Sequence, residues 1–259
     1  MTVFVILCLL ICICFLKGVS SVVPFGANYT EVKSERAQAD APQSIPAQAG
    51  NVTELNIFGY SITQSWQGYF GDISGSIMLS DANDRAMYNW SLASPEGEVY
   101  ASRGDSINWG GIQCFNFTAT GTYDDDLLNK GNTSLYGMNL SQIEFDYNIN
   151  SEDVDGVSDT FNLIGAGTHD LFYTNNLEFT EGECRSTRIY GDSGKGEINE
   201  FEEVMLYDSD TRSVVFTSLL EQDLGGFDSE THDFEMMVLE DGHETDTLIT
   251  PYYFYVELQ

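Results

Sequence analysis

The chain has 259 residues, enough for one large domain or two of ordinary size. Of these, 42% are apolar and 13% aromatic, enough to fill a core, so the chain is not a disordered acidic tail. Its 41 Asp and Glu against 10 Lys and Arg give a net charge of −31, which repels nucleic acids and anionic membranes and attracts cations. No nucleic acid is therefore expected as a partner. Such acidity suits either high salt, which screens self-repulsion, or neutralisation by divalent ions.

The chain begins with a segment typical of export. Residues 3–16, VFVILCLLICICFL, form an apolar run of the length of a signal-peptide core and short for a membrane span. Small residues before position 22 predict a signal peptide over residues 1–21 and a protein that is secreted or at the cell surface. Because no Lys or Arg precedes the run, an uncleaved membrane anchor is the alternative, and it would be the chain's contact with a membrane.

Residues 22–50 are rich in Pro, Ala and Gln and lack a periodic apolar pattern, which predicts a flexible linker. From residue 51 onward, apolar residues alternate in short runs between turn residues, as in strands. The sequence thus predicts an all-β fold of two tandem immunoglobulin-like β-sandwich modules, residues 51–155 and 156–259. The last run, YYFYVEL (252–258), is expected to be a closing strand.

Two stretches repeat one pattern 127 residues apart. IMLSDANDRAMYNW (77–90) and VMLYDSDTRSVVFT (204–217) share Met, Leu, Asp and Arg at matching positions. Each reads as a hairpin: in the first, Ile77 and Leu79 share one face of a strand, and Tyr88 and Trp90 alternate along the returning strand. Duplication of a sandwich unit explains the match, and convergence on the same turn residues is the alternative.

Six Asn-x-Ser/Thr sequons suit an exported glycoprotein. They lie at Asn28, Asn51, Asn89, Asn116, Asn132 and Asn139. Around Asn89, Asn116 and Asn139 the neighbouring residues are apolar, so in a strand each Asn would face water.

Outside the apolar run the chain has two cysteines, Cys114 and Cys184. In an oxidising compartment an even pair predicts one disulfide, and two buried thiols that never meet are the alternative. The 127-residue offset duplicates neither cysteine, so the bridge would not belong to the repeated unit.

A cation site is predicted at Asp153, Asp155 and Asp159, because alternate carboxylates around a Gly turn can converge on calcium. A solvated acidic loop is the alternative. No other cofactor is expected, and no catalytic residues are assigned. Gly191–Gly194 matches the serine-protease motif Gly-Asp-Ser-Gly in letters, but neither the following Lys195 nor the setting of His169 fits that family.

Several stretches resemble a family of exported archaeal proteins that look like envelope or surface proteins. The resemblance rests on ITQSWQGYFGDISGSIML (62–79), YNW (88–90), GEVYAS (97–102), GFDSETHDFEMMVLEDG (226–242) and YYFYVEL (252–258). It implies a location and a structural role and brings no catalytic residues.

Together these features predict a secreted, acidic, glycosylated cell-surface protein that is structural or adhesive and not an enzyme. It would contact other envelope proteins, or copies of itself through edge strands, or act through cations. The alternative is a secreted glycan-binding module or glycan hydrolase, suggested by the aromatic residues and the excess of carboxylates. A cleft with two facing carboxylates, or an exposed row of aromatic rings, would favour that alternative.

Overall fold

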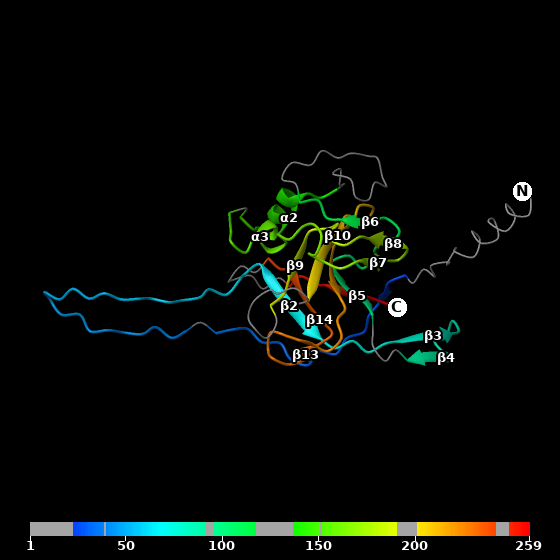
Figure 1. Ribbon diagram of the computed structural model, residues 1–259, viewed down its shortest axis with the longest axis horizontal. Helices are drawn as coiled ribbons and strands as arrows, with labels where there is room; N and C mark the ends of the chain where they lie inside the picture. The colour runs from blue at the N-terminus through cyan, green and yellow to red at the C-terminus, as the bar shows by residue number, and fades with distance from the viewer. Residues whose placement is uncertain are drawn as a thin grey trace, which may run out of the picture.

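The computed structural model describes residues 23–38, 40–91, 96–117, 137–150, 152–190, 201–241 and 249–259. Its centre is a seven-stranded antiparallel sheet in the order β1-β15-β5-β11-β10-β6, with β9 also paired to β10 (Figure 1). These strands are β1 (Phe25–Gly26), β5 (Gly97–Ser102), β6 (Ile112–Cys114), β9 (Ser186–Arg188), β10 (Glu202–Asp208), β11 (Ser213–Leu219) and β15 (Tyr253–Leu258). The predicted all-β class is confirmed.

Four pairs of strands lie outside the central sheet. They are β2 (Trp66–Gly71) with β14 (Phe234–Leu239), β3 (Ser76–Ser80) with β4 (Ala86–Ser91), β7 (Phe172–Thr174) with β8 (Leu177–Phe179), and β12 (Leu224–Gly225) with β13 (Thr231–His232). All are antiparallel. We call the central sheet and everything packed on it the body.

The central strands are buried on both faces. Every residue of β10 is buried, and successive residues belong to two different hydrophobic clusters, Val204 and Leu206 to one, Met205 and Tyr207 to the other. Because side chains alternate across a strand, the two clusters lie on opposite faces of the sheet. A strand covered on both faces accounts for the unbroken apolar run from Val204 to Tyr207.

The strand pair β2–β14 and two short helices cover one face. Ser218 Oγ on β11 donates a 2.8 Å hydrogen bond to Glu235 O, and Met237 N donates a 2.9 Å bond to Glu203 Oε2, so β14 is tied to the central sheet. The other face packs against Trp109 and the β7–β8 hairpin.

The two predicted sandwich modules are not confirmed as separate units. Strand β5, from the predicted first module, lies between β11 and β15, both from the predicted second. Strand β6 likewise pairs with β10. One sheet therefore combines strands from both sides of the predicted boundary at 155/156.

The helices α2 (Leu140–Asp146) and α3 (Val157–Thr160) were not expected from the alternation. Asn139 begins α2 as its N-cap, and a capping box with Gln142 satisfies both backbone N–H groups. Asn139 therefore does not lie in a strand, which was the condition for expecting it to face water. The sequence Asn-Leu-Ser-Gln carried the helix signal.

Both predicted hairpins form. The pairs Ser76–Ser91, Ile77–Trp90, Met78–Asn89 and Leu79–Tyr88 of β3–β4 recur, 127 residues on, as Glu203–Ser218, Val204–Thr217, Met205–Phe216 and Leu206–Val215 of β10–β11. The surroundings differ completely. Hairpin β10–β11 is the buried centre of the body, whereas β3–β4 projects from it and pairs with no third strand among the described residues (Figure 1).

Candidate functional site

The β3–β4 hairpin carries an apolar face that the body does not cover. Ile77 pairs with Trp90 and Leu79 with Tyr88, so these four side chains share one face of the two-stranded sheet. Their exposed fractions lie between 43 and 57%. The Tyr88 and Trp90 rings lie 4.6 Å apart between centroids, at 48° to each other. A two-stranded sheet with a bare apolar face is marginal in water, which makes this face a candidate contact site.

A second projection lies at the opposite end of the molecule. Residues 28–62, which we call the arm, run outward from β1 and back to β2 as two extended limbs (Figure 1). Tyr60 Oη on the returning limb donates a 2.9 Å hydrogen bond to Gln38 O on the outgoing one. Gly50, at φ 89°, lies in the turn between the limbs, where Asn51 N bonds Gln48 O.

Hydrogen bonds tie both ends of the arm to the body. At its start Ala27 N donates to Phe254 O at 2.9 Å, and just beyond its end Thr63 Oγ1 donates to Asp155 Oδ2 at 2.6 Å. Trp66 Nε1 also donates to Asp155 O, at 2.7 Å. Within the described chain, residues 52–60 form no backbone–backbone hydrogen bond. The predicted linker over 22–50 thus starts inside the sheet, at β1, and the extended segment continues to residue 62.

Exposed apolar side chains concentrate in these two projections. Of the 24 large apolar residues exposed in the described chain, 14 belong to the arm or the hairpin. The arm has four acids and two bases, and residues 76–91 have two acids and one base. The two projections are therefore apolar and nearly neutral, on a chain whose net charge is −31.

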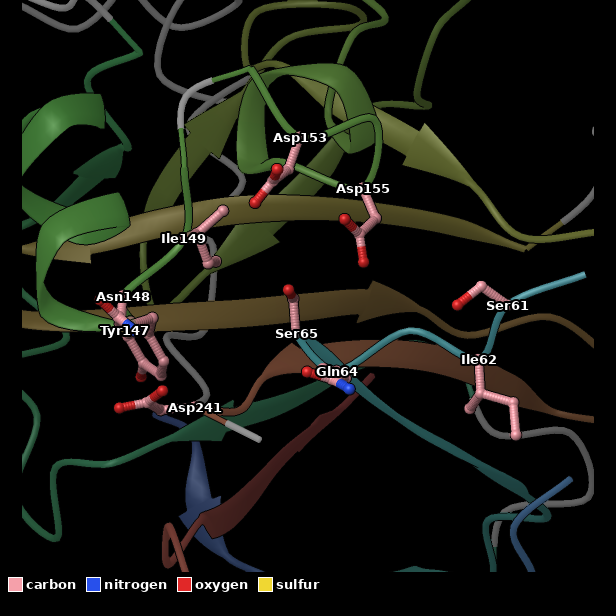
Figure 2. A pocket seen from close by; sticks show the side chains of 10 residues that line it. All are labelled: Ser61, Ile62, Gln64, Ser65, Tyr147, Asn148, Ile149, Asp153, Asp155 and Asp241. Atoms are coloured by element: carbon pink, nitrogen blue, oxygen red, sulfur yellow. The ribbon is translucent and has the colours of Figure 1, made fainter. Parts of the chain in front are cut away.

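A shallow pocket of about 300 Å³ lies where the base of the arm meets the end of α2 (Figure 2). Asp153 and Asp155 lie along one side of it and Asp241 on the other, next to Tyr147. Its remaining lining residues are Ser61, Ile62, Gln64, Ser65, Asn148 and Ile149. The pocket is therefore polar and acidic, without an apolar lining that would suit a large organic ligand.

Two of the three predicted calcium ligands reach this pocket. Asp153 and Asp155 line it, whereas Asp159 does not. Asp155 Oδ2 accepts from Thr63, and Asp153 Oδ2 accepts from Asn150 N at 3.1 Å. In the described part of the chain, no three His, Cys, Asp or Glu side chains lie close enough to hold one metal ion. Calcium binding by these residues stays a prediction.

Two carboxylates face each other inside the body. Glu98 and Glu257 are directly opposite across β5 and β15, with 3% and 1% exposure. Tyr100 Oη lies 3.4 Å from Glu98 Oε2 and 3.2 Å from Glu257 Oε2. Burial and the charge of the neighbouring Glu257 raise the pKa of Glu98 to about 8. Burial alone raises the pKa of Glu257 to about 7.

This pair serves packing, since the β7–β8 hairpin closes over it. Tyr173 N donates to Glu98 Oε1 at 3.4 Å and Asn175 N donates to Glu257 Oε2 at 2.9 Å. The Tyr100 hydroxyl has one proton to donate, so a protonated carboxyl completes the network. Because both carboxyls are buried, no substrate can reach them, and they do not form the open pair of a glycosidase.

Other buried acids also serve the fold. Glu203 accepts a hydrogen bond from the backbone N–H of Met237. Burial raises the pKa of Glu203 well above its usual range. Glu202 forms a 2.9 Å ion pair with Arg188 and accepts a 2.6 Å bond from Asp170 N. Burial still raises the pKa of Glu202. Pattern reading missed these residues because a buried Glu in an alternating strand looks like a solvent-facing one.

Cys114 and Cys184 form the predicted disulfide, with 5.3 Å between their Cα atoms. It joins β6 to the loop before β9 and closes a loop of sequence separation 70. His169, which is fully buried, supports the same loop: its Nδ1 donates to Asp170 O at 2.7 Å and its Nε2 accepts from Cys184 N at 3.1 Å. Both ring nitrogens are thus used by backbone groups, and burial lowers the pKa of His169.

The predicted glycosylation sites lie in different surroundings. Asn28, Asn51 and Asn89 are exposed, and Asn139 is half-buried at the helix N-cap. Asn116 is only 4% exposed and bridges Asn139, so the prediction that it faces water is wrong. Asn132 and Gly191–Gly194 lie outside the described residues. Glycosylation itself stays a prediction.

Among the three tryptophans only Trp90 is strongly exposed. Trp109 is buried against Tyr100 and Tyr255, and Trp66 packs against the core. The alternation of Tyr88 and Trp90 predicted their shared face, but it could not reveal that no second layer covers it.

No family model matches the chain, and neither the curated proteins nor the solved structures include a significant match. In the described residues, no helix combines the length and apolar character needed to cross a bilayer.

Proposed function

We propose that this chain is a secreted, glycosylated cell-surface protein with a structural or adhesive role, and that it is not an enzyme. Its contacts with other envelope proteins, or with its own copies, would be made by the arm and the β3–β4 hairpin. The apolar run at 3–16 supports export, and the resemblance to exported archaeal envelope proteins supports the location. The matched register of the two hairpins supports an origin by duplication.

One observation carries the proposal: an acidic body bears two nearly neutral projections that hold most of its exposed apolar side chains. Exposed apolar patches of this kind mark sites of protein contact. A filled core beneath them, closed on both faces of the sheet, suits a load-bearing module. Cation binding by Asp153, Asp155 and the wider acidic surface would add contacts that depend on divalent ions.

Fractionation of cells that produce the chain tests the proposal. We expect part of the protein to be bound to the envelope and to be released by agents that weaken apolar contacts. A protein recovered entirely as a freely diffusing monomer in the medium would refute a surface role.

Glycan binding is the second candidate function, and the exposed Tyr88–Trp90 pair is the observation that favours it. Aromatic rings at a surface can stack on sugar faces. Affinity electrophoresis in gels cast with soluble polysaccharides would test it, with Trp90→Ala compared against Phe145→Ala, which removes an exposed ring from α2. Glycan binding would be favoured if the polysaccharide retards the wild type and Phe145→Ala but does not retard Trp90→Ala.

A further inference from the structure

The β3–β4 hairpin lacks what a small sheet needs to be stable. Both of its edges are free, because β3 and β4 pair only with each other among the described strands. Three strands with one covered apolar face are the usual minimum for a sheet that is stable in water. The hairpin therefore lacks at least one strand and a cover for its apolar face.

The arm has the properties of the missing strand. Residues 52–60, VTELNIFGY, are extended and rich in residues that favour strands, and their backbone groups are not used within the described chain. Leu55 and Ile57, 53% and 85% exposed, fall two positions apart and would share one face of a strand. Added to an open edge, this segment would extend the apolar face of Ile77, Leu79, Tyr88 and Trp90.

The two parts cannot meet within one chain. Among the described residues, the arm and the hairpin project from opposite sides of the body (Figure 1). Both ends of the arm are anchored to the body, at Phe254 and Asp155, and the arm extends away from its own hairpin (Figure 1). The strand must therefore come from another molecule.

Charge permits a second copy of this chain as the partner, provided that the two bodies stay apart. Two bodies of this acidity repel each other, but the projections that would meet are nearly neutral. The returning limb, residues 51–62, reaches about 40 Å from the body at roughly 3.3 Å per residue. That reach exceeds the Debye length of about 8 Å at physiological salt, so screening weakens the repulsion between the bodies of joined copies.

We propose that residues 52–60 of one copy add as a strand to an open edge of the β3–β4 hairpin of the next copy. Main-chain hydrogen bonds would provide the pairing, and Leu55 and Ile57 would cover part of the apolar face. Because the contact joins two different surfaces at opposite ends, it repeats head to tail and builds an open chain. This inference rests on the proposed function and names the partner of the same site.

Two variants of the full chain test the proposal. Ile57→Pro removes a backbone donor from the arm, and Leu79→Glu puts a charge on the apolar face of the hairpin. Val32→Pro, on the outgoing limb, and Phe145→Glu, on the body, are the matched controls, since both residues are exposed. The apolar run at 3–16 is present in all four variants and cannot explain a difference between them.

Sedimentation is measured against concentration for each protein. We expect the wild type and both controls to form assemblies whose mass grows with concentration, while Ile57→Pro and Leu79→Glu each sediment as a 28.8 kDa chain. An equal mixture of these two variants should form one-to-one dimers and nothing larger, because each retains the half that the other lacks. Unchanged melting temperatures and an intact disulfide show that the bodies are folded.

Three results would overturn the inference. They are a wild type that stays monomeric, an Ile57→Pro variant that still assembles, and a mixture of the variants that does not pair. Assembly of Ile57→Pro would mean that hairpins associate with each other. A monomeric wild type that still fractionates with the envelope would overturn this inference alone and leave the proposed function standing.

Discussion

The buried Glu98–Glu257 pair predicts an unusual dependence of stability on pH. Both folded pKa values, about 8 and about 7, lie above the ordinary value of 4.5. Between pH 4.5 and 7 the folded chain therefore holds protons that the unfolded chain has released. Their contribution to stability is full below pH 4.5 and is lost as pH rises through 7 to 8.

The informative perturbation is Glu98→Gln, which keeps the shape of the side chain and removes one titrating group. The amide can still accept from Tyr173 N and can donate toward Tyr100. One proton retained by the folded state over two pH units changes the free energy of unfolding by about 3 kcal/mol. Between pH 5 and pH 7, the variant should therefore lose about 3 kcal/mol less stability than the wild type.

Urea denaturation at pH 5, 6, 7 and 8 and constant ionic strength measures this difference. Urea is preferred because guanidinium is itself a salt and would screen the acidic surface. Glu96→Gln is the control, since it removes an exposed acid two residues away and changes the net charge equally. Its pH profile should parallel that of the wild type. Parallel profiles for Glu98→Gln and the wild type would show that Glu98 does not retain a proton in the folded state over this range.

Three further predictions concern other parts of the body. Replacing Cys114 and Cys184 together by Ala should lower the free energy of unfolding by about 4 kcal/mol, the value for a disulfide that closes a loop of this length. Urea denaturation curves that coincide with those of the oxidised wild type would contradict this prediction. Burial lowers the pKa of His169, so the stability that this residue contributes is present above pH 6.5 and is lost as pH falls. The backbone N–H of Cys184, which donates to His169, should therefore be less protected from hydrogen exchange, corrected for intrinsic rates, at acidic pH. Equal protection at pH 5 and pH 7.5 would contradict this. Millimolar calcium should raise the melting temperature more than sodium at matched ionic strength, and less so in Asp155→Asn; equal effects of the two salts would leave screening as the cause.

Sequence patterns predicted strands and hairpins well because period-two alternation and turn residues are local. Alternation alone puts Ile77 with Leu79 and Tyr88 with Trp90, and the pairing register brings all four to one face. Helix α2 could also have been found, from Asn139 and Gln142. The pairing of Cys114 with Cys184 followed from their number and from the inferred compartment.

The tertiary arrangement could not be read in the same way. A hairpin pattern is the same whether its surroundings are a core or water, so 77–90 and 204–217 read alike although one projects and the other is central. The positions of Glu98 and Glu257 across one sheet depend on pairing between residues 159 apart, which no local pattern encodes. The strand predicted at 252–258 forms as β15, but it lies between β5 and the short β1 and is not a free edge.

The most direct test of a surface role mediated by the projections compares cells that produce Leu79→Glu with cells that produce Phe145→Glu. Both substitutions add one charge at an exposed apolar side chain, and only the first alters the hairpin face. We expect Phe145→Glu to stay with the envelope like the wild type, and Leu79→Glu to be released to the medium as a folded protein. Equal partition of the two variants between envelope and medium would contradict it.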